Sequence, residues 1–319
     1  MATKEKKEPT RRPGRPKTYE TKVIIPHDGI VSEPSEKNYR LEIVYEKPSS
    51  IKAVFTYFKN IKSKQIHVQC TPDTLTFFVR DHCNTQRTLV KINGDQLNKY
   101  YCSTEFMIYI NLEYIEPIIN AIDASIGTIS FIQDEDHSNI YIILYNINLK
   151  KECKYKLELS TFEKDQILYD AAQYLLPEVL ESYPIAYTIS AKDFKKSISD
   201  ILNLTQNVEE TVYFEKSSAT EPLHFYKQAE KISYWESYHD EKEIRLVNKL
   251  GNEPFRISVR LTNLKCLHNA LLGGNITIYA KEGTDMIFTT SAEEFIPVEG
   301  GTPLCQKKPI IISTILQLK

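Results

Sequence analysis

The chain has 319 residues, a formal net charge of −2, 41% hydrophobic residues and 26% charged residues. This composition is typical of a globular protein of about two domains, and it excludes a wholly disordered chain. The sequence lacks an apolar run long enough for a membrane span, a secretory signal, a glycine-rich phosphate loop and a nucleophile elbow. Its six cysteines are widely spaced and predict reduced thiols in an intracellular protein.

Residues 1–37 have the composition of a disordered basic arm. The first 17 residues contain seven Lys and Arg against two Glu, and residues 11–17 read Arg-Arg-Pro-Gly-Arg-Pro-Lys. Gly-Arg-Pro between basic residues is the pattern of an AT-hook, which places Arg in the minor groove of A·T-rich DNA. Pro13 stands where the usual motif has Arg, and a nuclear-import or nonspecific basic tail is the alternative. The candidate DNA-binding residues of the arm are Arg11, Arg12, Arg15 and Lys17.

Residues 38–160 have the pattern of a domain with two helices and several strands. Residues 39–45 alternate as a strand does, Pro48 and two serines supply a helix start, and apolar residues then recur at helical spacing up to residue 61. We expect further strands at residues 64–69, 74–80, 87–92 and 106–110, a second helix at 112–122, and strands at 128–133, 140–146 and 152–159.

Residues 161–184 break this pattern and read as a connector with some helix, after which the order of elements repeats in residues 185–319. We expect strands at 185–189, 211–215, 224–228, 231–236, 243–247, 255–259, 275–281, 286–290 and 310–315, with helices at 191–204 and 261–272. The repeat predicts an α+β fold of two topologically similar domains, each with two helices packed on antiparallel sheets.

Cations gather on one face of three of the four expected helices. A face that carries cations and no acid suits the phosphate backbone of DNA, whereas an ordinary solvated helix face is the alternative. No aromatic or amide cluster accompanies these cations, so we expect binding without sequence preference. The second helix carries Glu113, Glu116 and Asp123 and no cation, which argues against a uniformly positive surface. The candidate DNA-binding residues are Lys52, Lys59, Lys62, Lys64, Lys192, Lys195, Lys196, Arg260, Lys265 and His268, with Arg256 nearby.

Several segments resemble PCNA-type sliding clamps, and the resemblance extends over residues 39–319. Residues 49–61 resemble the first clamp helix, residues 100–102 and 107–112 a later strand and helix start, and residues 194–201 the first helix of the second clamp domain. Within the family, residues 57–64, 70–72 and 76–81 and the basic arm are similar to the clamp homologues of African swine fever virus and related large DNA viruses.

The resemblance implies a viral, homotrimeric ring that encircles double-stranded DNA and tethers a DNA polymerase and other replication and repair proteins. It implies no catalysis, no cofactor and no metal, and a location in the host cytoplasm, at the viral replication site, or in the nucleus. Lys52, Lys59 and Lys196 match DNA-facing positions of the family. The connector at 161–184 then separates clamp domains at 38–160 and 185–319.

The resemblance also implies two protein interfaces. One subunit contact would pair the strand edge at 152–160 with the edge at 231–236, through Cys153, Tyr155, Leu157, Leu159, Ile232 and Tyr234. Partner peptides would bind under the connector, against Leu168, Leu175, Leu176, Phe78 and Arg80, although these residues suit an ordinary core equally well. Residues 293–308 read as an extra loop beside this partner site.

Two other functions remain open. The chain could be a monomeric or dimeric processivity factor of the same fold that grips DNA electrostatically, or a replication scaffold without DNA contact. A metalloenzyme would need a convergent site. His67 and Cys70, and His82 with Cys83, have the donor types for Zn²⁺, but we expect them in alternating strands where His67 and Cys70 face opposite sides.

Overall fold

The computed structural model describes residues 39–83, 85–134, 138–159, 177–183, 185–205, 210–217, 221–228, 232–238, 244–246, 254–270, 274–281, 286–294 and 307–316. The basic arm with Arg11, Arg12, Arg15 and Lys17 lies outside these residues, and so do Leu168, Leu175 and Leu176 of the connector. Among the described helices, none is long and apolar enough to cross a membrane.

The first half of the chain has the predicted elements, with ends that differ by a few residues. Helix α1 begins at Pro48, whose fixed backbone angle suits a first turn, and buries Ile51, Val54 and Phe58 along one side. The elements are β1 (Tyr39–Tyr45), α1 (Pro48–Asn60), β2 (Gln65–Cys70), β3 (Thr74–Arg80), β4 (Gln86–Asn93), the 3₁₀ turn η1 (Gly94–Gln96), β5 (Lys99–Cys102), β6 (Phe106–Asn111), α2 (Leu112–Asn120), β7 (Ile126–Asp134), β8 (Asn139–Asn146) and β9 (Lys151–Glu158).

The second half repeats this order. Helix α5 begins after Ser190, whose side chain accepts a hydrogen bond from the Asp193 amide, and buries Phe194, Ile198 and Ile201. The elements are α4 (Pro177–Glu181) in the connector, β10 (Ile185–Ser190), α5 (Ala191–Leu204), β11 (Thr211–Lys216), β12 (Leu223–Lys227), β13 (Tyr234–Tyr238), β14 (Ile244–Leu246), β15 (Phe255–Arg260), α6 (Leu261–Ala270), β16 (Asn275–Ala280), β17 (Met286–Glu294) and β18 (Lys307–Leu316).

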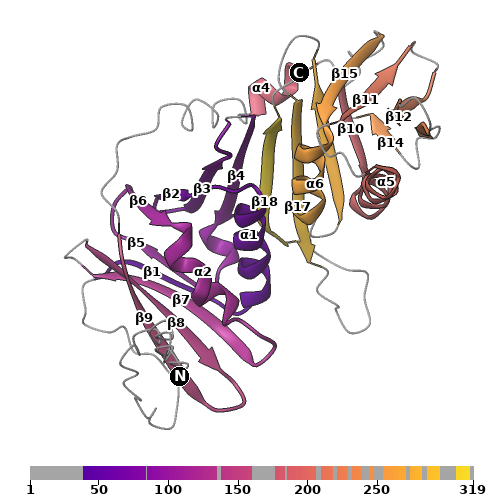
Figure 1. The fold of residues 1–319 in the computed structure, drawn as a ribbon. Helices are drawn as coiled ribbons and strands as arrows, with labels where there is room; N and C mark the ends of the chain where they lie inside the picture. The colour runs from indigo at the N-terminus through magenta and orange to yellow at the C-terminus, as the bar shows by residue number, and fades with distance from the viewer. Residues whose placement is uncertain are drawn as a thin grey trace, which may run out of the picture.

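The described strands form three antiparallel sheets (Figure 1). A five-stranded sheet has the order β5-β1-β7-β8-β9, and a four-stranded sheet has the order β13-β12-β11-β15. The nine-stranded sheet, β14-β10-β16-β17-β18-β4-β3-β2-β6, contains strands from both halves. Among the described strands, one pair joins the two halves: β18 runs antiparallel to β4, with Ile312 opposite Val90 and Thr314 opposite Thr88.

The long helices lie in a row along the sheets. Helix α2 contacts α1, α1 contacts α6 across the two halves, and α6 contacts α5 (Figure 1). One side of this helix row packs on a continuous hydrophobic core that includes Phe58, Phe77, Phe194 and Phe288. The α+β fold of two topologically similar domains is thus confirmed, and it leaves the other side of the helix row exposed.

A buried polar cluster lies where the two halves meet. The Tyr57 hydroxyl is 2.8 Å from the Thr314 hydroxyl and 3.2 Å from that of Thr88, and Gln86 Nε2 donates to Tyr57 Oη at 2.9 Å. These side chains come from α1, β4 and β18, so the cluster connects a helix of the first half to the last strand of the second. Burial raises the pKa of Tyr57 to about 12.

Candidate nucleic-acid interface

The predicted cations of α1 and α5 lie on the exposed side of the helix row. Because the apolar residues of each helix face the sheets, Lys59 on α1 and Lys192 and Lys196 on α5 are exposed, while Lys52 and Lys195 are half-buried. Lys62 and Lys64 follow α1 and are both exposed. The arrangement gathers positive charge on one surface, which suits sequence-independent contact with phosphates.

Helix α6 and the strand before it supply the remaining cations of this surface. Lys265 is exposed and His268 is half-buried, and the His268 Nε2 atom lies 2.9 Å from the Ser199 hydroxyl of α5. Arg260 is half-buried at the end of β15. Arg256 lies elsewhere: its guanidinium group is 4.6 Å from the ring centre of Tyr213 on the four-stranded sheet. The expectation that Arg256 joins the helix cations is therefore wrong, because its side chain packs on an aromatic ring of the four-stranded sheet.

The acidic helix α2 provides counter-ions for α1. Glu116 forms an ion pair with Lys59, and a hydrogen bond from Lys59 lowers the Glu116 pKa. The Lys52 ammonium group donates to the carbonyl oxygen of Ile122, just beyond α2. Hydrogen bonds from Ser125 chiefly lower the Asp123 pKa, and the charge of Lys52 adds to that effect. Of the acidic residues that argue against a uniformly positive surface, Glu116 therefore compensates the charge of Lys59, and Asp123 lies in the field of Lys52.

The ion pair on α5 is exposed to solvent and therefore weak. The Lys196 ammonium nitrogen is 3.3 Å from a carboxylate oxygen of Asp200, one helical turn away. The Lys196 side chain is 78% exposed, so water and salt screen the pair and its contribution to stability is small. Lys196 therefore remains available to an approaching phosphate.

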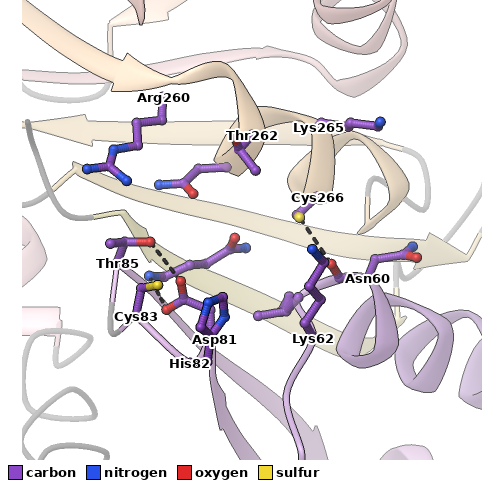
Figure 2. A pocket seen from close by; sticks show the side chains of 13 residues that line it. Asn60, Lys62, Asp81, His82, Cys83, Thr85, Arg260, Thr262, Lys265 and Cys266 are labelled. Carbon is purple, nitrogen blue, oxygen red and sulfur yellow. Dashed lines mark hydrogen bonds between the residues drawn. The ribbon is translucent and has the colours of Figure 1, made fainter. Parts of the chain in front are cut away.

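A pocket of about 320 Å³ lies at the seam between the halves, between the end of α1, the turn from β3 to β4, and the start of α6 (Figure 2). Lys62, Arg260 and Lys265 line it. The acidic side chain at the pocket is already bonded, because Asp81 Oδ1 accepts from the Gln86 amide at 2.9 Å and Oδ2 from the Thr85 hydroxyl at 2.7 Å. The first turn of α6 contains no acid, and its partial positive charge adds to that of the cations.

Asn263 is a pocket residue that sequence reasoning missed. Its side chain is 5% exposed, and its Nδ2 atom is buried with no acceptor among the described residues. A buried donor without a partner costs free energy, so a pocket with this donor and three cations is suited to an anion. No sequence pattern identifies Asn263, because only the meeting of α6 with the first half buries it.

The two candidate metal-ligand pairs, His67 with Cys70 and His82 with Cys83, do not converge on one site. His67 faces the outer side of the sheet and Cys70 faces the core, whereas His82 and Cys83 lie in the turn after β3 rather than in a strand as expected. The ligand atoms of Asp81, His82 and Cys83 lie within 4.8 Å of one another. Since both Asp81 oxygens accept hydrogen bonds from the turn itself, this arrangement stabilises the turn.

Two sheets end in the strands that were expected to form a subunit contact. β9 is the last strand of the five-stranded sheet, and β13 is the last strand of the four-stranded sheet. Cys153, Tyr155 and Leu157 point toward the helix side of β9, and Leu159 follows them. Tyr234 begins β13, but the 55% exposed Ile232 lies two residues before the strand. Both strands have one backbone edge without a partner strand among the described residues.

The expected partner site is described only in part. Phe78 is buried on the face of β3 turned away from α1, opposite His67 on β2 and Leu89 on β4. Arg80 is half-buried at the end of the same strand, opposite Arg87. Leu168, Leu175 and Leu176 lie outside the described residues, so their place beside Phe78 stays a prediction.

Comparisons with known proteins agree on one family. Residues 40–167 match the family model of the N-terminal domain of proliferating cell nuclear antigen (PCNA). An uncharacterized protein from a Malawi tick isolate of African swine fever virus is 34% identical, over 89% of this chain and 94% of that protein. Its counterpart from a Kenyan pig isolate is 33% identical, over 90% and 95%. The crystal structure of PCNA from Entamoeba histolytica superposes with a TM-score of 0.68 at 13% identity, covering 88% of this chain and all of the other.

Proposed function

This chain belongs to the PCNA family of sliding clamps, and from that premise we propose that it is a viral DNA processivity factor that works as a homotrimeric ring around duplex DNA. The ring would tether a DNA polymerase and other replication and repair proteins and would catalyse no reaction. The observation that carries the proposal is the strand pair β18–β4, because it joins one domain to the next in a way that a second copy of the chain can repeat.

The free strand edges support assembly into a ring. Inside the chain, the last strand of the second half pairs with the third strand after α1 in the first half. The last strand of the first half is β9, and the third strand after α5 is β13, and both lie at sheet edges. A β9–β13 pair between copies would be a head-to-tail contact, which closes into a ring when its rotation allows. Membership of the PCNA family supports three copies.

The helix row would then line the channel. Lys52, Lys59, Lys62, Lys64, Lys192, Lys195, Lys196, Arg260, Lys265 and His268 would contact phosphates, and the basic arm would add a further contact through Arg11, Arg12, Arg15 and Lys17. Phosphate contacts are independent of base sequence, so they permit sliding. In a closed ring, topology holds the protein on DNA, and the electrostatic contacts need not be strong.

Partner proteins would bind at the connector. We place their docking site at Leu168, Leu175 and Leu176 with Phe78 and Arg80, and we set the clamp domains at residues 38–160 and 185–319. An extended or helical peptide with apolar anchors suits such a groove. The viral origin of the related proteins supports action inside an infected host cell, in the cytoplasm or nucleus.

The first test is the solution mass of the full chain over a range of concentrations, measured by sedimentation. A species of three times the 36.9 kDa chain mass is expected. The trimer should then stay on a loaded closed circle at high salt and leave when the circle is cut, because only topology holds it. A persistent monomer or dimer with steeply salt-dependent binding to short linear duplexes would contradict the ring and favour an open factor that grips DNA.

A further inference from the structure

We propose that the β9–β13 contact between copies has one fixed register, in which Lys154 of one copy lies against Trp235 of the next. The inference rests on the proposed self-assembly and adds the residues that meet and the chemistry that holds them. It is derived from the internal repeat, because the β18–β4 pair inside the chain serves as a template for the pair between copies.

The first correspondence between the halves comes from β6 and β15. Each strand has six residues and runs directly into a helix, so Ile108 corresponds to Ile257. From these two residues, the cross-strand partners run Ile108–Val68–Phe77–Val90 in the first half and Ile257–Phe214–Phe225–Glu236 in the second. Glu236 on β13 therefore occupies the place of Val90 on β4.

The second correspondence comes from α1 and α5. Their buried residues fall at the same spacing when Pro48 is matched to Ala191, and the last inward residues of the preceding strands are then Tyr45 and Ile189. From these, the cross-strand partners run Tyr45–Ile129–Leu144–Cys153 and Ile189–Ile276–Thr290–Ile312. Cys153 on β9 therefore occupies the place of Ile312 on β18.

The two correspondences fix the register between copies. Since Ile312 lies opposite Val90 inside the chain, Cys153 of one copy lies opposite Glu236 of the next. The strands are antiparallel, so Lys154 then lies opposite Trp235 and Tyr155 opposite Tyr234. A shift by one residue would turn every side chain of β9 to the wrong face of the joined sheet.

Trp235 is suited to receive a cation. Its side chain is 57% exposed on the outer face of β13, and its ring stacks on Tyr226 at 4.2 Å between ring centres. Tyr226 stacks on Tyr213 at 5.2 Å, and Arg256 covers Tyr213, so the row is capped by a cation at one end and open at Trp235. Residues directly opposite in an antiparallel pair have Cβ atoms about 5 Å apart, within reach of a cation–π contact.

Lys154 has the matching position on β9. Its ammonium group already lies 4.1 Å from the ring centre of Tyr141 in its own chain. In the joined sheet it would lie between Tyr141 and Trp235 of the next copy, with an aromatic face on both sides. The occupant of the exposed Trp235 surface is therefore a second copy of this chain, because the surface is continuous with the β13 edge and complements the outer face of β9.

Disulfide cross-linking tests the register directly. Glu236→Cys places a thiol opposite the native Cys153, and opposite residues in antiparallel strands have a spacing that a disulfide can bridge. In a background with the exposed Cys83 changed to Ser, oxidation with diamide should give covalent species of up to three chains. The matched control, Ser237→Cys, moves the thiol by one residue to the outer face and should stay uncross-linked, as should Glu236→Cys combined with Cys153→Ser.

The outcomes separate the register from the assembly. If the wild type sediments as a trimer and Glu236→Cys does not cross-link, or Ser237→Cys cross-links as well as Glu236→Cys, the register is wrong and the proposed ring stands. If the wild type is a monomer at every concentration, the proposed assembly fails and the register falls with it.

Fluorescence tests the Lys154–Trp235 contact. The chain has one tryptophan, so its emission reports this surface alone. Dilution that separates the subunits should shift the emission to the red as Trp235 becomes exposed to water. Lys154→Ala should weaken association by about 2- to 5-fold per junction, the usual range for an exposed cation–π contact. Lys156→Ala, which removes the same charge from the same face, should have a smaller effect; equal effects of the two variants would contradict the contact.

Discussion

At the scale of single residues, the pocket at the seam contains a buried hydrogen-bond donor that the described residues leave unpaired. Asn263 Nδ2 is buried without an acceptor among the described residues, beside Lys62 and Lys265. Leaving a buried donor unpaired costs about 1 to 3 kcal/mol, and a phosphate oxygen would remove that cost. The opposite situation holds at Lys59, where Glu116 already compensates the charge.

Replacing Asn263 by Leu separates stability from binding. The variant keeps a side chain that branches at Cγ and removes the unpaired donor, so the free energy of unfolding in urea should stay unchanged or rise. Affinity for a duplex of about 24 base pairs at low salt should fall by about 10- to 100-fold, the usual effect of losing a hydrogen bond to a charged group. Unchanged affinity with unchanged stability would mean that the pocket does not contact DNA.

Lysine-to-glutamine variants measure the charge at the pocket. Lys62→Gln and Lys265→Gln should each weaken duplex binding and reduce the slope of log affinity against log salt by about one, because each removes one phosphate contact. Lys91→Gln is the matched control, since Lys91 is exposed on the face of β4 turned away from the helices. An equal change in slope for all three variants would show that the effect comes from the net charge of the protein and not from contacts at the pocket.

Removing the counter-ion of Lys59 should have the reverse effect. Glu116→Gln keeps the shape of the side chain and frees the Lys59 ammonium group. We expect duplex affinity at low salt to rise by about 2- to 5-fold, with the difference fading as salt screens the charge. Glu113→Gln on the same helix serves as the control for net charge, and a gain in both variants alike would remove the specific role of the ion pair.

At the scale of elements, the seam depends on a strand pair and a buried cluster of hydroxyl groups. The Tyr57 hydroxyl on α1 contacts Thr88 on β4 and Thr314 on β18. Because burial favours its neutral form, the pKa of Tyr57 is raised to about 12. The folded state therefore holds this proton more tightly than the unfolded chain, whose tyrosine pKa is about 10. The resulting stability is complete below about pH 10 and is lost as pH rises toward 12.

Tyr57→Phe tests this cluster. Loss of the hydroxyl leaves Gln86 and two threonines without their shared partner, so the free energy of unfolding should fall by about 1 to 3 kcal/mol at neutral pH. The variant should also lose less stability than the wild type between pH 10 and 12, measured by urea unfolding at each pH. If the free energy of unfolding changed with pH in the same way for both proteins over that range, the Tyr57 pKa would not differ between the folded and unfolded states.

At the scale of the whole molecule, the fold separates the surfaces that different functions require. The helix row carries the cations, the sheets lie behind it, and the edge strands β9 and β13 belong to different halves of the chain (Figure 1). This arrangement allows copies to join edge to edge while every copy presents its helix row on the same side of the joined sheets. Self-assembly and phosphate contact then use different residues and can be disrupted separately.

Charge reversal on the helix row tests that separation. Lys59→Glu combined with Lys196→Glu should abolish stimulation of a cognate polymerase and leave the sedimentation mass unchanged, because neither residue lies on β9 or β13. Lys91→Glu reverses a charge on the face of β4 turned away from the helices and should preserve stimulation. Full stimulation by the double variant would favour a scaffold whose function does not need DNA contact.

The sequence alone determined the elements, their repetition and the class of fold. Alternation along residues 39–45 and the helical spacing of Phe194, Ile198 and Ile201 are local signals, since each depends only on which face of one element is buried. The repeat and the motifs of residues 49–61 then identified the family, and the comparisons confirmed it.

Only the tertiary structure decided how these elements meet. The β18–β4 pair joins segments more than 200 residues apart, and no local pattern encodes such a pairing. The same holds for the Glu116–Lys59 ion pair, which gives the acidic helix its role, and for Asn263, which is polar in sequence and buried only at the seam. Local periodicity specifies which face of an element is buried, whereas the choice of neighbour depends on packing and register over the whole chain.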